Sequence, residues 1–382
     1  MKAASFAALS IETCRETVSA ATLLDVAEPA WLGRGQIPSL HGFRALSILL
    51  VLIAHLAQQG TWLPRIWHLT ELGRLGVDMF FVISGFLITV LLLREQARHE
   101  AISLKQFYLR RACRILPAYL FFLLGIGVLQ QVNVVTLTGW DWLGASTSSV
   151  GFLPAPSWDI GHIWSLSVEE HFYLLWPLAI CFWPRRGWIV AALTIVVTPP
   201  LRWLIHAQCP DLHVAYCTLT RMDTIAVGCG LAYLAHWPTF RRWLHVSARS
   251  AYLLTIVMLL GVALSERLAQ RVPAYQILVH PLLVASLDAL AIWLWSQHSH
   301  TWLGVVLNSR TAVVIGSLSY SLYLWQQPFL NPHSSAWHTQ FPANVIGLCV
   351  MASLSYLLIE RPFLRLKDRL PKERPAAASL LR

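Results

Sequence analysis

Two ionisable residues, Arg44 and His55, lie in the otherwise apolar segment LHGFRALSILLVLIAHL at residues 40–56. A charge in hydrocarbon costs at least a few kcal/mol, so such residues are candidates for function. On a helix, eleven residues of separation place both on one face, within about 20°, and roughly 16 Å apart along the axis. We therefore expect the two side chains to serve opposite ends of a bundle interior. The alternatives are a snorkelling anchor for Arg44 and a structural histidine for His55.

Carboxylates occur in two further apolar segments. Asp78 lies near the start of GVDMFFVISGFLIT, and Glu169 lies in GHIWSLSVEEHFYLLWP. A carboxylate beside an imidazole fixes its tautomer and raises its basicity. If the helices are antiparallel, Asp78 and Glu169 reach the depth of His55, and the three form an acid/base group in the outer half of the membrane. Ser84–Gly85 offers a small surface for close helix packing.

The segment around Glu169 also contains a helix-start pattern. Ser167 and Glu170 have the spacing of a capping box, which predicts that a helix begins there. Capping explains these two residues but not the neighbouring Glu169. Arg221 begins another apolar segment, RMDTIAVG, on the expected outer side. We take Glu170, Arg221 and Trp164 as candidate substrate-binding residues.

Three arginines, Arg110, Arg111 and Arg114, lie close together in the segment FYLRRACRILPAY. Guanidinium groups at a membrane surface can clamp phosphates with paired hydrogen bonds. The alternative is a charge cluster that only stops membrane insertion. Together with Arg44 they form a cationic inner side opposite the acid/base group. A phosphate-bearing donor could then dock from the cytosol while an acceptor reacts from the other end.

The composition indicates which elements hold these residues. The chain has 382 residues, is 56% hydrophobic and 13% charged, and has a mean hydropathy of +0.55. A soluble enzyme of this size needs more charge to cover its surface. Apolar runs of bilayer length instead predict an all-α polytopic membrane protein. We predict a bundle of about ten transmembrane helices, near residues 42–58, 75–93, 115–130, 165–184, 187–205, 221–237, 250–265, 276–296, 312–330 and 342–360.

Basic residues set the expected orientation. With a cytoplasmic N-terminus, 23 of the 29 Lys and Arg residues fall on the cytoplasmic side, so the positive-inside rule favours an even number of spans with both termini cytoplasmic. We predict a cytosolic segment at 1–39 without a signal-peptide pattern, a transmembrane domain at 40–362 and a basic cytosolic tail at 363–382. The net charge of +10 follows from the same bias and does not indicate nucleic-acid binding.

Residues of the expected outer loops leave alternatives open. Cys209 and Cys217 flank the stretch CPDLHVAYC, and they form a disulfide if it faces an oxidising compartment or otherwise remain thiols. Trp140, Trp142 and Trp158 form either an interfacial belt or a platform for sugar rings. The sequence has no GxSxG, HExxH or Walker A motif, so no serine hydrolase, zinc protease or NTPase is indicated, and we expect no metal.

The same segments carry a family resemblance. From about Ser39 to Pro362 the chain resembles the membrane-integral acyltransferase 3 family, bacterial enzymes that O-acylate surface glycans and some natural products. In this sequence Arg44 is present with His55, but His41 stands where the family usually has aspartate, and Gln326 stands where it often has histidine. The segments that carry the resemblance are LHGFRALSILLVLIAHL, GVDMFFVISGFLIT, FYLRRACRILPAY, HIWSLSVEEHFYLLWP, IGSLSYSLYLWQQP and LIERPFLRL.

The resemblance implies an acyl-coenzyme A co-substrate, most often acetyl-coenzyme A, and a hydroxyl acceptor on a carbohydrate such as lipopolysaccharide or exopolysaccharide. It makes His55 the catalytic base, places Arg44 in the same essential motif, and assigns donor phosphates to Arg110, Arg111 and Arg114. Transfer is direct or passes through an acyl-imidazole on His55. It also implies the bacterial cytoplasmic membrane, with membrane lipids and a carbohydrate or glycolipid as partners.

Two other functions are compatible with the sequence. A transporter or flippase for a polar or lipid-linked sugar also needs intramembrane charges, although no repeated halves are evident. A family member without activity could act as an assembly partner, and the replaced aspartate and histidine suggest this alternative.

Overall fold

The computed structural model is almost entirely helical, and it describes residues 14–15, 32, 37–59, 67–99, 101–183, 186–209 and 211–369. Long helices dominate these ranges, joined by short helices and by a two-residue antiparallel pairing of β1 (Cys14–Arg15) with β2 (Ala101–Ile102). The long helices are α1 (Leu40–Gln58), α2 (Trp67–His99), α3 (Leu104–Gln131), α6 (Trp164–Phe182), α7 (Gly187–Gln208), α8 (Met222–Leu234), α10 (Ala248–Ala269), α12 (His280–Gln297), α14 (Arg310–Phe329) and α15 (Ala343–Leu354), which continues through the π-helical η4 (Ser355–Glu360) into α16 (Arg361–Arg369). The short helices are α4 (Gly139–Ser146), η1 (Val150–Phe152), α5 (Trp158–Gly161), η2 (Thr218–Thr220), α9 (Pro238–Trp243), α11 (Pro273–Leu278), α13 (Trp302–Leu307) and η3 (Trp337–Thr339).

The helices identify a multi-pass, all-α membrane protein, as predicted. Among the described residues, six helical stretches are long and apolar enough to cross a membrane by length and composition: Leu40–Gln58, Glu71–His99, Leu104–Gln131, Gly187–Gln208, Ala248–Ala269 and Ala343–Arg369. The other four expected spans overlap α6, α8, α12 and α14. Ten spans and the cytoplasmic placement of both termini stay predictions. The predicted segments 1–39 and 363–382 lie largely outside the described residues.

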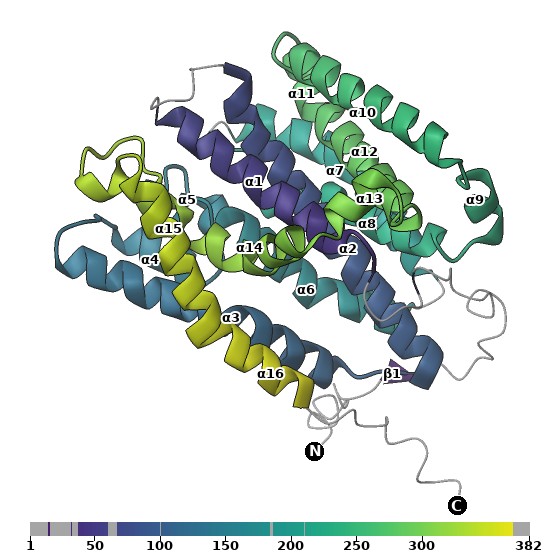
Figure 1. Cartoon of the computed structure of the whole chain (residues 1–382), viewed down its shortest axis with the longest axis horizontal. Helices are drawn as coiled ribbons and strands as arrows, with labels where there is room; N and C mark the ends of the chain where they lie inside the picture. Colours follow the sequence, from purple (N-terminus) through teal and green to yellow (C-terminus); the bar gives the residue numbers. More distant parts are fainter. Residues whose placement is uncertain are drawn as a thin grey trace, which may run out of the picture.

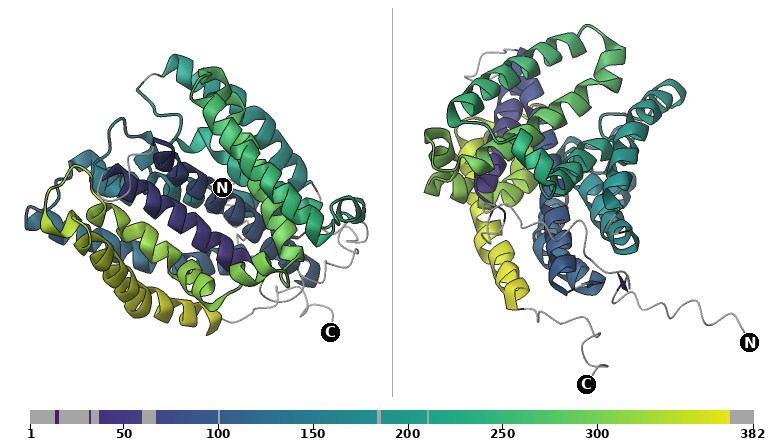
Figure 2. Two further views of the ribbon diagram at one scale, coloured as in Figure 1. Left: turned by 45° about the horizontal axis from the view of Figure 1, so that its top comes forward. Right: turned by 90° about the vertical axis from the view of Figure 1, so that its right-hand side faces the viewer.

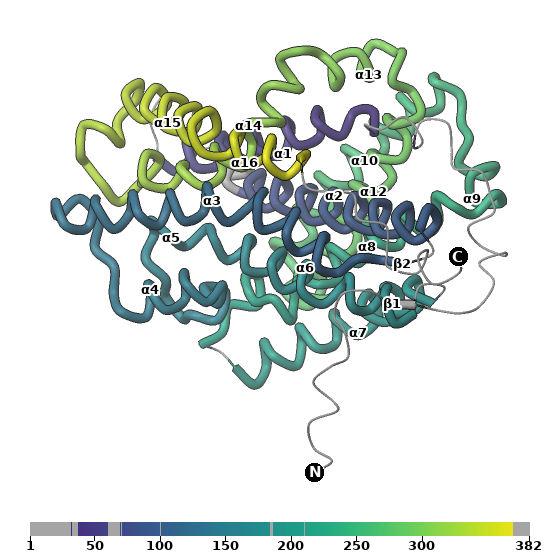
Figure 3. Tube along the Cα trace, turned by 90° about the horizontal axis from the view of Figure 1, so that it is seen from below, coloured from purple at the N-terminus to yellow at the C-terminus, as the bar shows by residue number. Residues whose placement is uncertain are grey.

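Helices α1, α2 and α14 form the centre of the bundle (Figure 1). Helix α1 packs against α2 and α14, and α2 packs against α8. Figures 1 and 2 show α10 and α12 on one side of this centre and α3, α15 and α16 on the other. In Figure 3, α4 and α7 lie on one face and α13 and α15 on the opposite face. One apolar core joins α2, α3, α6 and α14, and a second joins α1, α2, α8 and α12.

Helices α2 and α8 cross at backbone contact because each has a glycine at the crossing. A Cβ atom on Gly85 would lie 2.1 Å from the backbone oxygen of Ile225, and one on Gly228 would lie 2.1 Å from that of Val82. Any larger side chain would force the helices apart. The small surface predicted at Ser84–Gly85 is therefore confirmed for Gly85, whereas the Ser84 side chain points toward another helix.

Two ionic networks, one partly exposed at Arg74 and one buried between Arg202 and Asp223, account for other polar residues in the apolar helices. Arg74 on α2 donates to both carboxylate oxygens of Glu266 on α10 at 3.1 and 3.0 Å. Nε2 of His280 on α12 lies 3.0 Å from the same carboxylate. Arg202 on α7 pairs with Asp223 on α8 at 2.5 Å. Because removing one partner of a buried pair leaves an uncompensated charge, these networks hold the peripheral helices in register.

The cysteines and tryptophans of the expected outer loops lie in different environments. Cys209 and Cys217 are free thiols, Cys209 exposed at the end of α7 and Cys217 buried before η2. Trp140 is 72% exposed, whereas the side chain of Trp142 approaches α3 and that of Trp158 contacts α1. The three tryptophans therefore do not form one continuous platform.

Candidate active site

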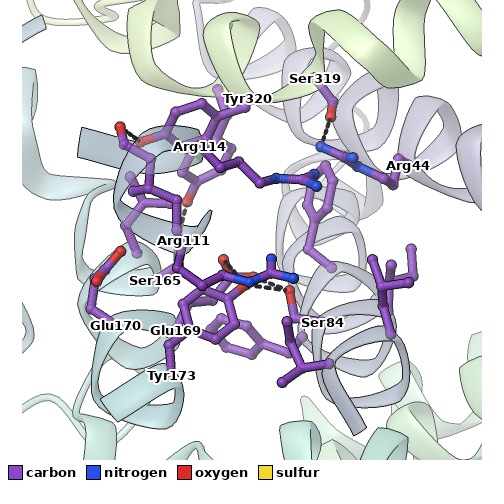
Figure 4. A pocket seen from close by; sticks show the side chains of 18 of the residues that line it. Arg44, Ser84, Arg111, Arg114, Ser165, Glu169, Glu170, Tyr173, Ser319 and Tyr320 are labelled. Atoms are coloured by element: carbon purple, nitrogen blue, oxygen red, sulfur yellow. Dashed lines mark hydrogen bonds between the residues drawn. The ribbon is translucent and has the colours of Figure 1, made fainter. Parts of the chain in front are cut away.

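A pocket between α1, α2, α3, α6 and α14 collects many of the polar residues that the sequence analysis selected (Figure 4). The space between its atoms amounts to about 840 Å³, including the part open to solvent. Its polar lining contains three arginines, two glutamates, three serines and three tyrosines, and apolar residues, most of them from α2, line the remainder. A concave site that combines an apolar wall with converging polar groups suits a ligand with both charged and apolar parts.

Three guanidinium groups enter this pocket from two helices. Arg44 on α1 donates a hydrogen bond to Oγ of Ser319 on α14 at 3.0 Å. Arg111 and Arg114 extend from α3, and Figure 4 shows both pointing across the pocket toward α1 and α2. The Arg111 guanidinium lies 5.4 Å from the ring centre of Tyr173, a favourable cation–π contact. Like charges gathered inside a helical bundle favour an anionic ligand.

Two adjacent glutamates line the same pocket. Oε1 of Glu169 accepts a hydrogen bond from Ser84 at 2.7 Å, and Oε2 accepts one from the Tyr173 hydroxyl at 3.2 Å. Figure 4 shows the Glu170 carboxylate on the side away from Ser84. The expectation that Glu169 joins His55 is wrong, because Glu169 shares its pocket with the arginines instead. Within the described ranges, no group of three or more His, Cys, Asp and Glu residues is placed to hold a metal ion.

The residue at which α6 begins explains why Glu169 lies in the pocket. The helix begins at Trp164 with Ile163 as its N-cap, and Ser167 Oγ donates to the Ile163 carbonyl at 3.0 Å. Ser167 therefore lies inside the helix, and the capping-box interpretation of Ser167 and Glu170 is wrong. Because the helix starts earlier, Glu169 lies more than one turn from its end, which brings it to the depth of the pocket.

His55 lies in a second polar cluster and does not line the pocket. Its Nδ1 atom is 2.9 Å from Oε1 of Gln326 on α14, and its ring meets the indole of Trp158 edge to face with centroids 5.6 Å apart. The indole nitrogen of Trp158 donates to the carbonyl of Gln327 at 3.2 Å. On its other side Trp158 contacts the exposed ring of His333, at 5.3 Å. The imidazole thus faces protein groups of α5 and α14.

Asp78 pairs with Arg221 rather than with His55. The two side chains form a buried ion pair between α2 and the start of α8 and are 1% and 3% exposed. The Arg221 guanidinium also lies 6.0 Å from the ring centre of Trp164 and 5.7 Å from that of Phe81. The expected contact of Asp78 with the imidazole is wrong, because a buried guanidinium takes its carboxylate. Asp78, Arg221 and Trp164 do not line the pocket, and their catalytic and substrate-binding roles stay predictions.

Arg110 is separated from the other two arginines of its segment. It pairs with Glu95 at 3.1 Å and donates to Oε1 of Gln106 at 3.2 Å. Consecutive residues of a helix point about 100° apart, so Arg110 and Arg111 cannot both face the pocket. The structure therefore places Arg111 and Arg114 together with Arg44, whereas Arg110 is partly exposed and faces Glu95 of α2.

A buried histidine that the sequence analysis did not select connects the two clusters. Tyr323 lines the pocket, and its hydroxyl donates to the His162 carbonyl at 3.0 Å and lies 2.5 Å from Ser165 Oγ. The His162 ring lies between Oε1 of Gln327, 2.7 Å from Nδ1, and the carbonyl oxygen of Leu324, 3.0 Å from Nε2. Burial lowers the pKa of His162 to about 4, although both hydrogen bonds act in the opposite direction. The layer between the pocket and His55 is therefore polar and hydrogen-bonded.

A proline in the sequence indicates that such a layer must exist. Pro328 lies inside α14 and has no N–H, so the carbonyl of Leu324, four residues earlier, lacks its partner within the helix. A buried carbonyl without a partner requires a donor from elsewhere. The segment SLYLWQQP thus predicts that a donor approaches this turn, but only the packing of α14 against the α5–α6 turn identifies the donor as His162.

Comparison with known proteins identifies the family of this chain. The model of the acyltransferase domain family Acyl_transf_3 matches residues 37–360. Two proteins named O-acetyltransferase OatA, from Staphylococcus aureus strains NCTC 8325 / PS 47 and COL, are each 32% identical to the chain over 355 residues. These matches cover 85% of this chain and 57% of each relative, so the chain spans little more than half of their length. No solved structure matches it. Because the family model covers most of the chain, as the resemblance of its motifs predicts, the protein belongs to the acyltransferase 3 family.

Proposed function

We propose that this chain transfers an acetyl group from acetyl-coenzyme A to a hydroxyl of a carbohydrate-containing acceptor at the bacterial cytoplasmic membrane. Family membership and the O-acetyltransferase name of the relatives support the reaction class. The observation that carries the proposal is the convergence of Arg44, Arg111 and Arg114 in one pocket of the bundle. Coenzyme A carries several phosphate groups, the ligands that guanidinium groups bind with paired hydrogen bonds.

The donor occupies the pocket in this proposal. Arg111 and Arg114 bind its phosphates, and the apolar wall of α2 accommodates the uncharged arm that ends in the thioester. The end of the pocket at Ser165 and Tyr323 adjoins the layer that leads to His55. In this proposal the acyl group reaches His55 from the pocket through this layer, and the acceptor reaches the same ring from the side of Trp158.

His55 is the base of the proposed reaction. It takes the proton of the acceptor hydroxyl, the hydroxyl oxygen attacks the thioester carbonyl carbon, and the carbon–sulfur bond breaks. The coenzyme A thiolate then takes the proton from the imidazolium, so the products are the acetyl ester and free coenzyme A. A thioester is already activated, so proton removal and stabilisation of the oxyanion are the main catalytic tasks. The acetyl group moves directly or through an acetyl-imidazole on His55. We expect no metal ion to take part.

A transfer assay tests this function. Protein in lipid nanodiscs is incubated with acetyl-labelled acetyl-coenzyme A and a bacterial glycan extract, and we expect label on the sugar. His55→Ala lowers the rate by about 10²–10⁴-fold, the usual contribution of a general base, whereas His300→Ala, at an exposed histidine, does not. Normal transfer by His55→Ala contradicts the assignment of the base. Wild-type protein that binds acetyl-coenzyme A but leaves every sugar unlabelled contradicts the acceptor class.

A further inference from the structure

The His55 ring has two hydrogen-bond partners, the side chain of Gln326 and the backbone of Val51, which lies one turn earlier on the same helix. Gln326 lies on α14 and is 0% exposed, and its Oε1 atom is 2.9 Å from Nδ1 of His55 on α1. A carbonyl oxygen can only accept a hydrogen bond, so Nδ1 must carry the proton in this contact. A neutral imidazole protonated at Nδ1 has its lone pair at Nε2. The contact therefore selects the ring nitrogen that is free to act as a base.

The turn that carries Gln326 is tied to the rest of the bundle. The next residue, Gln327, accepts at Oε1 from the backbone N–H of His162 at 3.0 Å. The His162 ring also reaches the carbonyl of Leu324, which is available because Pro328 provides no N–H. These contacts connect the last turn of α14 to the α5–α6 turn on both sides of Gln326. The backbone of Gln326 is thus held while its side chain reaches across to α1.

We propose that Gln326 is the positioning residue of His55: its Oε1 atom holds the Nδ1–H tautomer, so that Nε2 receives the proton of the acceptor hydroxyl. This inference rests on the proposed function, in which His55 is the base. An amide orients the ring without adding a negative charge beside it. A carboxylate in the same place would keep the tautomer and also stabilise the imidazolium. Replacing Gln326 by glutamate and replacing it by a side chain without an acceptor should therefore affect the His55 ring differently.

The first test measures the ring itself and needs no turnover. Diethyl pyrocarbonate modifies the neutral imidazole, so the pH dependence of His55 modification, followed by peptide mass spectrometry, reports the pKa of the ring. We expect Gln326→Glu to move the midpoint to higher pH by about one unit, because the carboxylate favours the charged ring. Gln326→Leu moves it to lower pH, since the acceptor for Nδ1–H is lost. Gln297→Glu, the same change on α12, leaves it in place. An unchanged midpoint in both Gln326 variants overturns the proposal.

The second test separates tautomer selection from structural support. Gln326→Leu lowers kcat for acetyl transfer by about 10- to 100-fold, the range known for groups that orient metal-ligating histidines, with little change in KM for acetyl-coenzyme A. Gln326→Glu retains activity at high pH, and the acidic limb of its rate profile moves upward with the midpoint of modification. A Gln326→Glu protein that binds acetyl-coenzyme A but is inactive at every pH shows that the native ring is protonated at Nε2, and it overturns the proposal.

The two proposals fail in different ways. If His55→Ala transfers acetyl groups normally, the assignment of His55 as the base fails whatever Gln326 does. If His55→Ala is inactive while Gln326→Leu matches wild type in both kcat and modification midpoint, only the role of Gln326 fails.

Discussion

Arg110 and Arg111 are consecutive on α3 but have different partners. Arg110 pairs with Glu95 of α2 at 3.1 Å, and its side chain is 33% exposed. The Arg111 guanidinium lies 5.4 Å from the ring centre of Tyr173, in the pocket. Because consecutive helical residues point about 100° apart, one basic segment supplies both a partly exposed ion pair to α2 and a guanidinium group in the pocket.

This difference predicts unequal effects on donor binding. Arg111→Ala should weaken acetyl-coenzyme A binding by about 10- to 100-fold, the loss of one hydrogen bond to a charged group. Arg110→Ala should weaken it by less than about threefold, because a partly exposed ion pair contributes little. Calorimetry on protein in nanodiscs measures both. A loss in Arg111→Ala as small as that expected for Arg110→Ala would show that the pocket does not bind the phosphates.

The close crossing of α2 and α8 predicts a difference between two glycines of one helix. Gly228→Ala places a methyl group 2.1 Å from the backbone oxygen of Val82, so we expect a loss of about 1–3 kcal/mol or more from overpacking. Gly230 has nothing within 4 Å of the same position, and Gly230→Ala should stabilise the helix by about 0.5–1 kcal/mol. Thermal unfolding in detergent compares them. Similar melting temperatures for both variants would contradict the crossing.

The buried pair of Asp78 and Arg221 predicts a loss of stability without a loss of donor binding. Asp78→Asn removes the carboxylate that is paired with the buried Arg221 guanidinium, and the loss of one partner of a buried pair typically destabilises a protein by about 3–5 kcal/mol. Acetyl-coenzyme A affinity of the folded fraction should not change, since neither residue lines the pocket. Asp368→Asn, whose side chain is 73% exposed, is the control and should melt like wild type. An Asp78→Asn protein with normal stability but no transfer would instead support the catalytic role that the sequence predicts.

Because His162 is buried, we expect the protein to lose stability at acidic pH. Burial lowers its pKa from the ordinary 6.5 to about 4 in the folded protein. Between these values the unfolded chain binds a proton that the folded protein does not, so stability decreases as the pH falls below about 6.5. The full difference amounts to about 3 kcal/mol, at about 1.4 kcal/mol for each pKa unit.

Melting temperatures of wild type and His162→Gln, measured from about pH 7.5 to 4.5, check this effect. Glutamine does not titrate, so the variant should lose less stability over this range, even if it starts from a lower value. His300→Gln, at an exposed site, should follow the wild-type curve. A His162→Gln curve with the wild-type slope would mean that other groups cause the acid sensitivity.

Several features of the site could be predicted from the sequence because they depend on one helix only. The spacing of Arg44 and His55 excludes direct contact, and the structure indeed places them in separate clusters. The close-packing glycine at position 85 is likewise visible in its own segment. By contrast, the expected partners of Asp78 and Glu169 required knowledge of how two helices are offset along their axes, and both expectations were wrong.

The sequence by itself determined the class of fold, the family and the residues whose charge or hydrogen bonding needs an explanation, since a polar group in an apolar run is recognisable without coordinates. The tertiary structure alone decided the partners: Ser84 for Glu169, Arg221 for Asp78 and Gln326 for His55. The physical reason is that hydrogen bonds and ion pairs between helices depend on rotation and depth to within a few ångströms. Helix starts, proline positions and glycine crossings far apart in the chain set that rotation and depth together.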